Sequence, residues 1–214
     1  MSTELATPIV TGAVLVPDAT LVAGVLLERR ERGLDKYDEV WDGVYVMHAL
    51  PNDEHQKITN RLCHALTDVI EDAGRGEVRP GINLALDAEH WERDYREPDV
   101  VVFLDGSGAV CHGVFWTGPA DFAVEIISPS DKAREKLAFY AQAGTRELLF
   151  IDRDPWRLEL HRHDGAGLPL AEVGELGGGA IASRSLPITL RLVEGDPRPR
   201  ILVSESGTDR QWTV

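Results

Sequence analysis

The chain has 214 residues, enough for one domain with a sizeable core, and its hydrophobic fraction of 43% argues against disorder. Its 22 basic and 36 acidic residues give a net charge of −14, so a nucleic-acid partner would need a local basic patch, a divalent cation, or both. No apolar run approaches the roughly 18 residues of a membrane span, and the first residues lack the pattern of a secretory signal, so we expect a cytoplasmic protein with no membrane partner.

The first predicted elements are an arm, a helix and a hairpin. Residues 1–17 show no clear period, which predicts an arm, and the pattern from residue 18 to about residue 32 predicts a capped helix that Gly33 ends. Two β-rich runs, 37–41 and 44–47, flank Asp42-Gly43. That pair tolerates the positive φ angles of a type I′ turn, so the segment predicts a β-hairpin.

The clearest helix is predicted from about Asp53 to Asp72. Its apolar residues fall on one stripe, and Gly74 follows its end. A strand is predicted over residues 77–86. The next run, Val100 to Leu104, is continuously apolar and mostly β-branched, which is typical of a strand covered on both faces.

A βαβ unit is predicted in the second half of the chain. It consists of a strand at 122–127, a helix from about residue 131 to 143 and a strand at 147–151, and such units make their two strands parallel. Short strands follow, for example 158–162 and 188–193. We expect one α/β (α+β) domain over residues 18–193, with residues 194–214 as a tail of that domain. Its expected architecture is a mixed sheet flanked by helices, with a β-rich C-terminal extension.

Glu125 is the most informative residue, because it stands in the middle of an otherwise apolar strand. An unpaired carboxylate there would cost several kcal/mol, so the fold must supply a cation, a proton or a metal. Strand alternation places Ala123, Glu125 and Ile127 on one face, and Val124 and Ile126 on the other. Glu125 therefore points into one specific layer.

Asp99 begins the neighbouring apolar run, directly after Pro98. If the two strands are adjacent, Asp99 and Glu125 can share one end of the sheet and bind a hard divalent ion through oxygen ligands. The competing interpretation is a turn carboxylate for Asp99 and a salt-bridged core carboxylate for Glu125.

Other candidates come from the segments around these strands. Lys132 and Lys136 lie four residues apart on the predicted helix, where a shared face could deliver an ammonium group to the acidic site, although helix lysines are commonly solvated. Glu39 on the hairpin and His55 at a helix start form a further pair. His55 could exchange a proton near neutral pH, or serve only in the helix start.

Taken in order, these segments resemble the Uma2 family of restriction-endonuclease-like proteins, within the PD-(D/E)XK nuclease superfamily. The resemblance covers roughly residues 20–190 and depends on the hairpin 39–47, the helix opening 51–55, Arg96-Glu97-Pro98-Asp99 with Val100 to Val102, Val124-Glu125-Ile126-Ile127 with Ser128 to Ser130, and Lys136 to Tyr140 with Gly144.

The resemblance implies that Asp99 and Glu125 are the motif acids that hold Mg²⁺, with Mn²⁺ as a substitute, and that Glu39 and His55 lie in the same pocket. The superfamily's lysine normally stands two residues after the glutamate, but that position is Ile127. Lys136, with its K-x-x-x-Y spacing to Tyr140, is the expected replacement, and Lys132 is the weaker choice.

The resulting hypothesis is a Mg²⁺-dependent endonuclease that hydrolyses DNA phosphodiester bonds, with the metal on Asp99, Glu125 and the Ile126 carbonyl. Two alternatives stay open. The fold could serve as a binding or assembly module without turnover, as the net charge and the absence of a DNA-reading segment suggest, or it could hydrolyse small phosphate esters. A β-rich extension carrying Trp156 and Trp212 also predicts a homodimer.

Overall fold

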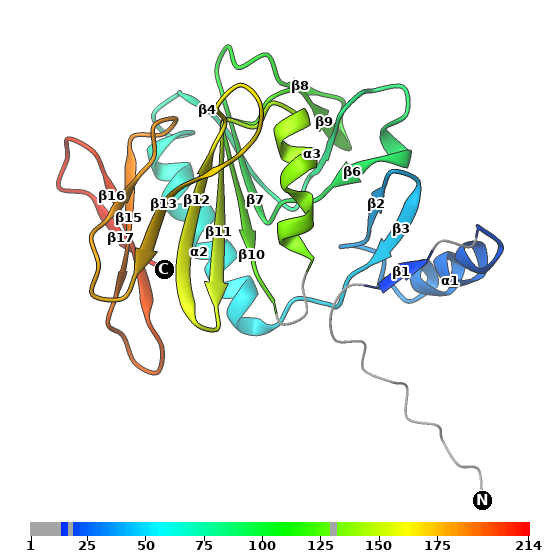
Figure 1. Ribbon diagram of the computed structural model, residues 1–214, viewed down its shortest axis with the longest axis horizontal. Helices are drawn as coiled ribbons and strands as arrows, with labels where there is room; N and C mark the ends of the chain where they lie inside the picture. The colour runs from blue at the N-terminus through cyan, green and yellow to red at the C-terminus, as the bar shows by residue number, and fades with distance from the viewer. Residues whose placement is uncertain (1–13, 17–18, 129–131) are drawn as a thin grey trace, which may run out of the picture.

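The computed structural model describes residues 14–16, 19–128 and 132–214. Its centre is a mixed sheet with the strand order β13-β12-β11-β10-β7-β4, called here the central sheet (Figure 1). β10 and β11 are parallel, and the other neighbouring pairs are antiparallel. Its strands are β4 (Gly76–Pro80), β7 (Val100–Leu104), β10 (Phe122–Ile126), β11 (Glu147–Arg153), β12 (Trp156–Arg162) and β13 (Leu170–Glu175).

The predicted βαβ unit is confirmed. β10 leads through the short helix α3 (Leu137–Gln142) to β11, and Glu125 pairs with Phe150 in parallel register. The predicted alternation also holds, because Val124 and Ile126 pack into one hydrophobic cluster while Ala123 and Ile127 pack into another. Glu125 therefore lies on the face of the sheet that α3 covers.

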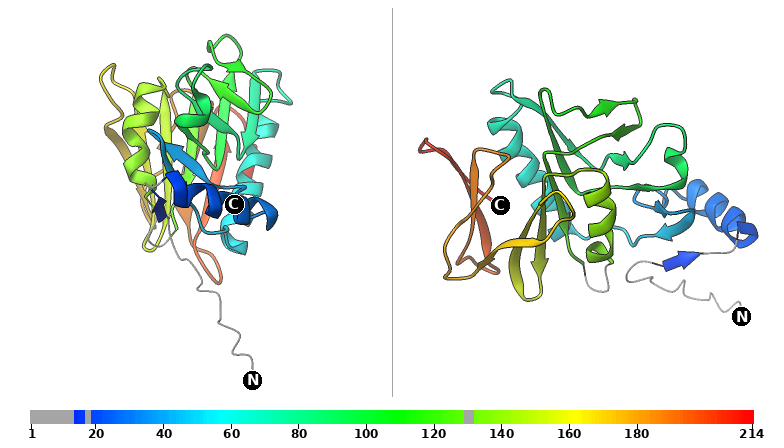
Figure 2. Two further views of the ribbon diagram at one scale, coloured as in Figure 1. Left: turned by 90° about the vertical axis from the view of Figure 1, so that its right-hand side faces the viewer. Right: turned by 45° about the horizontal axis from the view of Figure 1, so that its top comes forward.

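The opposite face of the central sheet is covered by α2 (Asp53–Val69) and by a C-terminal sheet. α2 begins at the predicted place because the side chain of Asn52 accepts the backbone N–H of His55, at 2.9 Å. Its apolar stripe, with Ile58, Leu62 and Leu66 fully buried, packs onto the sheet, and Figure 2 (left) shows α2 and α3 on opposite sides of the central strands. The C-terminal sheet consists of β14 (Ile181–Ala182), β15 (Ile188–Val193), β16 (Arg200–Glu205) and β17 (Gln211–Thr213).

The α3 side also carries an N-terminal sheet. Trp116 of this sheet stacks on Phe103 of β7 with ring centroids 4.1 Å apart, which joins the two sheets. Helix α1 (Ala19–Glu31) lies at its outer edge (Figure 1). The strands are β1 (Val14–Val16), β2 (Glu39–Trp41), β3 (Val44–Met47), β5 (Asn83–Ala85), β6 (Tyr95–Arg96), β8 (Val110–Cys111) and β9 (Phe115–Thr117).

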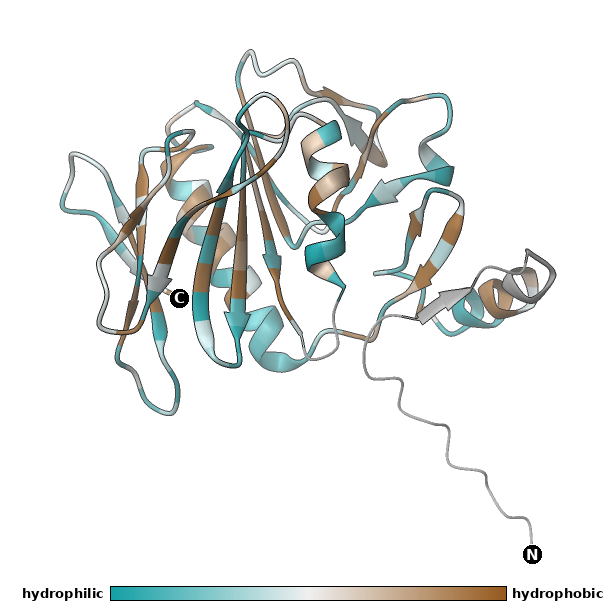
Figure 3. Ribbon diagram, viewed as in Figure 1, coloured by the Kyte–Doolittle hydropathy of each residue, from teal (hydrophilic) through white to brown (hydrophobic). Residues whose placement is uncertain are grey.

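The distribution of hydropathy explains this layered arrangement. The most hydrophobic residues lie along the central strands, which are covered on both faces, whereas α2 is hydrophobic on one stripe only (Figure 3). The hairpin at Asp42-Gly43 forms as predicted, with φ angles of 48° and 81°. These local signals confirm the mixed α/β fold class.

Three predicted elements differ in the structure. The strand expected over residues 77–86 is divided between β4 and β5, which belong to different sheets, because the chain turns at Gly81, where φ is +53°. The helix expected at 131–143 is a 3-10 turn over residues 133–136 followed by α3, while its first position, Asp131, lies outside the described residues. The prediction of an arm over residues 1–17 is wrong for residues 14–16, which form β1 and pair with β3. Residues 1–13 and 17 lie outside the described part of the chain.

Two further expectations concern the surface. Within the described ranges, no helix is both long and apolar enough to cross a membrane. Trp156 and Trp212, on which the expected homodimer depended, both pack against the core of their own chain. Trp156 lies under the guanidinium of Arg198, and the indole N–H of Trp212 donates to Asp68 at 2.8 Å. These two side chains therefore give no support to the homodimer, which stays a prediction.

Candidate active site

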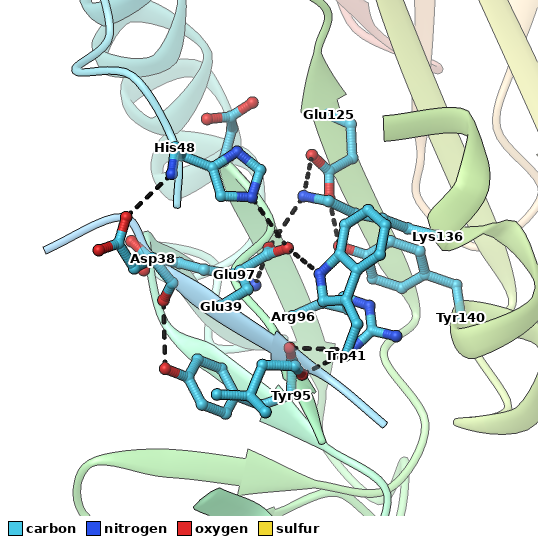
Figure 4. Close-up of polar contacts among 12 residues, drawn as sticks. Asp38, Glu39, Trp41, His48, Tyr95, Arg96, Glu97, Glu125, Lys136 and Tyr140 are labelled. Carbon is cyan, nitrogen blue, oxygen red and sulfur yellow. Dashed lines mark hydrogen bonds and ion pairs between the residues drawn. The ribbon is translucent and has the colours of Figure 1, made fainter. Parts of the chain in front are cut away.

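The ammonium group of Lys136 lies between two buried carboxyl groups (Figure 4). Its Nζ donates to Oε1 of Glu39 at 2.9 Å and to both carboxyl oxygens of Glu125 at 3.0 Å. Glu39 begins β2, Glu125 lies on β10, and Lys136 ends the 3-10 turn before α3. Three segments that are distant in sequence therefore meet at one buried ion-pair group.

Glu39 is held from several sides. Its Oε1 also accepts the backbone N–H of Glu97 at 2.7 Å, and its Oε2 accepts the indole N–H of Trp41 at 2.6 Å and lies 3.4 Å from Nε2 of His48. Burial alone would raise the pKa of Glu39, but the positive charge of Lys136 and the contact with His48 outweigh it and lower that pKa. Glu39 is therefore the ionised partner of Lys136.

The pKa of Glu125 is shifted in the opposite direction from that of Glu39. Burial raises its pKa, and the negative charges of Asp99 and Glu39 raise it further, against the lowering effect of Lys136 and of the hydroxyl of Tyr140. Tyr140 on α3 donates that hydroxyl hydrogen bond to Oε1 of Glu125. One ammonium group thus serves two carboxyl groups, which leaves Glu125 short of positive charge.

Asp99 stands just before β7, beside the end of β10, as predicted from the adjacency of the two strands. Its Oδ2 accepts the backbone N–H of Ile126 at 2.6 Å, and its Oδ1 lies 2.6 Å from Nε2 of His55. The second ring nitrogen of His55, Nδ1, is buried without a hydrogen-bond partner among the described residues. The structure therefore brings Asp99, Glu125 and Ile126 together, with His55 reaching Asp99 from α2.

Glu97 is a further acidic residue of this region, and sequence reasoning gave it no role. Burial raises its pKa to about 8, and the charges of Glu39 and Asp99 contribute to the rise. The sequence signal that could have identified Glu97 as a site residue is its position directly before Pro98-Asp99. The signal was weak because the neighbours that change its chemistry come from β2, far away in sequence.

The two candidate lysines do not share a face. Lys136 is buried between Glu39 and Glu125, whereas Lys132 pairs with Glu135 at 2.9 Å, partly in solvent. The segment 133–136 is a 3-10 turn, so the four-residue spacing of an α-helix does not apply to it. This geometry places Lys136, and not Lys132, beside the acidic residues.

Arg96 fixes β2 relative to α3. Its guanidinium lies between two rings, 4.8 Å from the centroid of Trp41 and 4.3 Å from that of Phe139, and it donates to the carbonyl of Val40 at 3.0 Å. Cation–π contacts of this kind are strongest when they are shielded from water. Arg96 therefore helps to keep Glu39 on β2 in reach of Lys136.

The donor chemistry of this region fits a hard divalent cation. Glu39, Glu97, Asp99 and Glu125 repel one another, which a cation would relieve, and carboxylate and carbonyl oxygens are the ligands that Mg²⁺ prefers. Among the described residues no three His, Cys, Asp or Glu side chains gather in a way that could hold a metal ion. Mg²⁺ commonly keeps several water ligands and binds through one or two carboxylates, so Asp99 and Glu125 with the carbonyl of Ile126 are a suitable set.

Comparison with known proteins finds a matching family model and a similar solved structure. Residues 34–193 match the model of a family described as "Uma2: Putative restriction endonuclease". The chain belongs to the Uma2 family. A crystal structure described as a putative nuclease belonging to DUF820, from Anabaena variabilis ATCC 29413, has a TM-score of 0.56 and 15% sequence identity, and the match covers 69% of this chain and 82% of that one. No curated protein matches this Uma2 chain.

Proposed function

We propose that this Uma2 protein is a Mg²⁺-dependent endonuclease that hydrolyses DNA phosphodiester bonds. The observation that carries the proposal is the contact of Lys136 with Glu125, beside Asp99, in a chain whose family is described as "Putative restriction endonuclease". This set contains the three side-chain types, an aspartate, a glutamate and a lysine, that the nuclease motif requires. Asp99, Glu125 and the carbonyl of Ile126 would hold the ion.

Asp99 and Glu125 supply negative charge at a fixed place. The backbone N–H of Ile126 and the ring of His55 orient the carboxyl group of Asp99, so little reorganisation is needed when a substrate binds. A bound Mg²⁺ supplies Lewis-acid activation of water and stabilises charge on the phosphate. His55, through Nε2, fixes the position of Oδ1 of Asp99.

Lys136 acts on the substrate side of Glu125. An ammonium group held by two carboxyl groups is oriented in advance, and it can position a water or stabilise the charge that develops on the phosphate. Tyr140 keeps Glu125 in place through its hydroxyl, and Glu39 holds the ammonium group of Lys136 through a contact of 2.9 Å. Glu39 and Tyr140 are therefore positioning residues in this proposal.

The test is plasmid cleavage by purified variants with Mg²⁺ or Mn²⁺. We expect Asp99→Asn and Glu125→Gln, which preserve side-chain shape, each to reduce cleavage by at least about 10²-fold while circular dichroism stays unchanged. Asp105→Asn is the matched control, because this exposed aspartate follows the opposite end of β7. Cleavage that persists in the purified double variant Asp99→Asn/Glu125→Gln would contradict the proposal.

Two observations favour a binding or assembly module as the second candidate function. Protein donors already engage both oxygens of Glu125, and the net charge is −14. A calorimetric titration showing no binding of Mg²⁺ or Mn²⁺ at millimolar concentration would favour this alternative. A hydrolase of small phosphate esters would instead cleave a chromogenic diester but not plasmid DNA.

A further inference from the structure

Four arginines lie on α2 and on the segments next to it, near the candidate active site. This arginine cluster consists of Arg61 on α2, Arg153 at the end of β11, Arg198 in the loop before β16, and Arg200 at the start of β16. Arg153 and Arg198 both pair with Glu54. Arg61 donates to the carbonyl of Thr213, whose neighbour Val214 exchanges backbone hydrogen bonds with Ile201, directly after Arg200. Burial lowers the pKa of Arg198, and the charges of the other three arginines lower it further, against the effect of Glu54. Figure 1 shows the β11–β12 turn, the start of α2 and the β15–β16 loop on the same, lower side of the molecule.

The cluster is connected to the candidate site through Arg153. Its guanidinium donates to the carbonyl of Ile127 and to Oδ1 of Asn52, both at 3.2 Å. Ile127 follows the β10 residue whose backbone N–H binds Asp99, and Asn52 caps the helix that carries His55. The cluster therefore continues the surface on which Asp99 lies.

Within the described residues, one carboxylate, that of Glu54, forms ion pairs with the arginine cluster. Glu54 accepts from Arg153 at 3.2 Å and from Arg198 at 2.7 Å. The hydrogen bonds of Arg61 and Arg200 go to backbone carbonyls, and within the described residues neither forms an ion pair with a carboxylate. Nη2 of Arg198 is buried without a hydrogen-bond partner in the described part of the chain. Guanidinium groups without a carboxylate partner are what a protein of net charge −14 needs to approach DNA.

We infer that Arg61 and Arg200 bind a backbone phosphate of DNA next to the phosphodiester at Asp99, an inference that rests on the proposed endonuclease function and identifies its substrate-binding surface. Guanidinium groups match phosphate oxygens with paired hydrogen bonds, and such contacts fix the position of the duplex without reading its sequence. Arg153 and Arg198 are positioning residues, because little of either side chain is exposed and both pair with Glu54. Four hydrogen bonds hold Arg153, and Arg198 donates to the carbonyl of Pro199 and lies over the ring of Trp156.

The experiment measures binding apart from cleavage. A fluorescein-labelled DNA duplex is titrated in EDTA with the full chain, with Arg61→Ala/Arg200→Ala, and with Arg184→Ala as the control at the opposite end of β15. We expect the double variant to bind roughly tenfold or more weakly, because it loses charge-assisted hydrogen bonds. Its slope of log affinity against log salt should fall by about 1, whereas Arg184→Ala should leave both quantities unchanged.

The outcomes separate this inference from the proposed function. Wild-type affinity and salt slope in Arg61→Ala/Arg200→Ala would overturn the inference, and plasmid cleavage by the same preparation would show that the endonuclease function survives. Equal weakening in Arg184→Ala, or no DNA binding by the wild-type chain, would also overturn it. Arginine-dependent binding without cleavage in Mg²⁺ would support the binding surface and contradict the endonuclease. Circular dichroism checks folding, which should persist because the two arginines lose only hydrogen bonds to carbonyls.

Discussion

Replacing Lys136 by Met should destabilise the fold strongly, because the ammonium group holds two buried carboxyl groups. Lys136 Nζ lies 2.9 Å from Glu39 and 3.0 Å from Glu125, and at an effective dielectric constant of about 20 each contact is worth roughly 5–6 kcal/mol of attraction. The net loss is smaller, because a carboxyl group left without its cation can take up a proton. Broken buried ion pairs cost about 3–5 kcal/mol, which is a large part of a typical domain stability of about 5–15 kcal/mol.

The loss of stability in Lys136→Met should depend on pH. Without the ammonium group, burial and mutual repulsion raise the folded-state pKa of Glu39 and Glu125 above the ordinary value of 4.5. The folded Lys136→Met protein then binds more protons than the unfolded protein, so its stability falls as pH rises above the unfolded value. The difference from wild type should therefore be largest near neutral pH and should shrink as pH falls toward 4.5.

Thermal unfolding in EDTA at several pH values measures both effects. For a chain of this length we expect a drop in the midpoint of about 6–20 °C at neutral pH. Lys132→Met is the matched control, since its partly exposed pair with Glu135 should contribute about 1 kcal/mol or less. A Lys136→Met midpoint equal to that of Lys132→Met, or a difference that grows as pH falls, would refute the reasoning.

Two smaller effects follow from other contacts. Tyr140→Phe removes the hydroxyl donor to Glu125 and should lower the free energy of unfolding in urea by about 1–3 kcal/mol, less than Lys136→Met does; no change would show that this hydrogen bond contributes nothing. At pH 8 a disulfide reagent should label exposed Cys111 quickly and Cys63 slowly, since burial raises the pKa of Cys63 to about 11 and leaves roughly 10⁻³ of it as thiolate. Fast labelling of the folded Cys111→Ser protein would contradict this.

Local patterns predicted most elements of the fold. The apolar stripe of α2, the Asp42-Gly43 turn and the apolar runs of β7 and β10 each carry their own signal, so the helix, the hairpin and the parallel βαβ unit are confirmed. The prediction of a single strand over residues 77–86 was wrong, because the chain turns at Gly81 and continues in a different sheet. Which sheet each half joins depends on partner strands elsewhere in the sequence.

The candidate site was partly visible in the sequence. A carboxylate in an apolar strand requires a partner, which identified Glu125, and strand adjacency placed Asp99 beside it. Helical spacing could not distinguish Lys136 from Lys132, because the segment is a 3-10 turn. Glu97 was missed since its raised pKa depends on distant residues.

The origin of the lysine links the chemistry to the packing of α3. The residue two positions after Glu125 is Ile127, whose side chain packs with Ala123 into the core on the α3 side. The ammonium group instead comes from the turn that leads into α3, and Phe139 and Tyr140 dock that helix on the sheet. A lysine at position 127, directly after β10, would be held in place by the strand, whereas Lys136 reaches Glu125 only while α3 is docked. Changes that loosen α3, even ones that touch neither carboxyl group, should therefore weaken the site together with the fold.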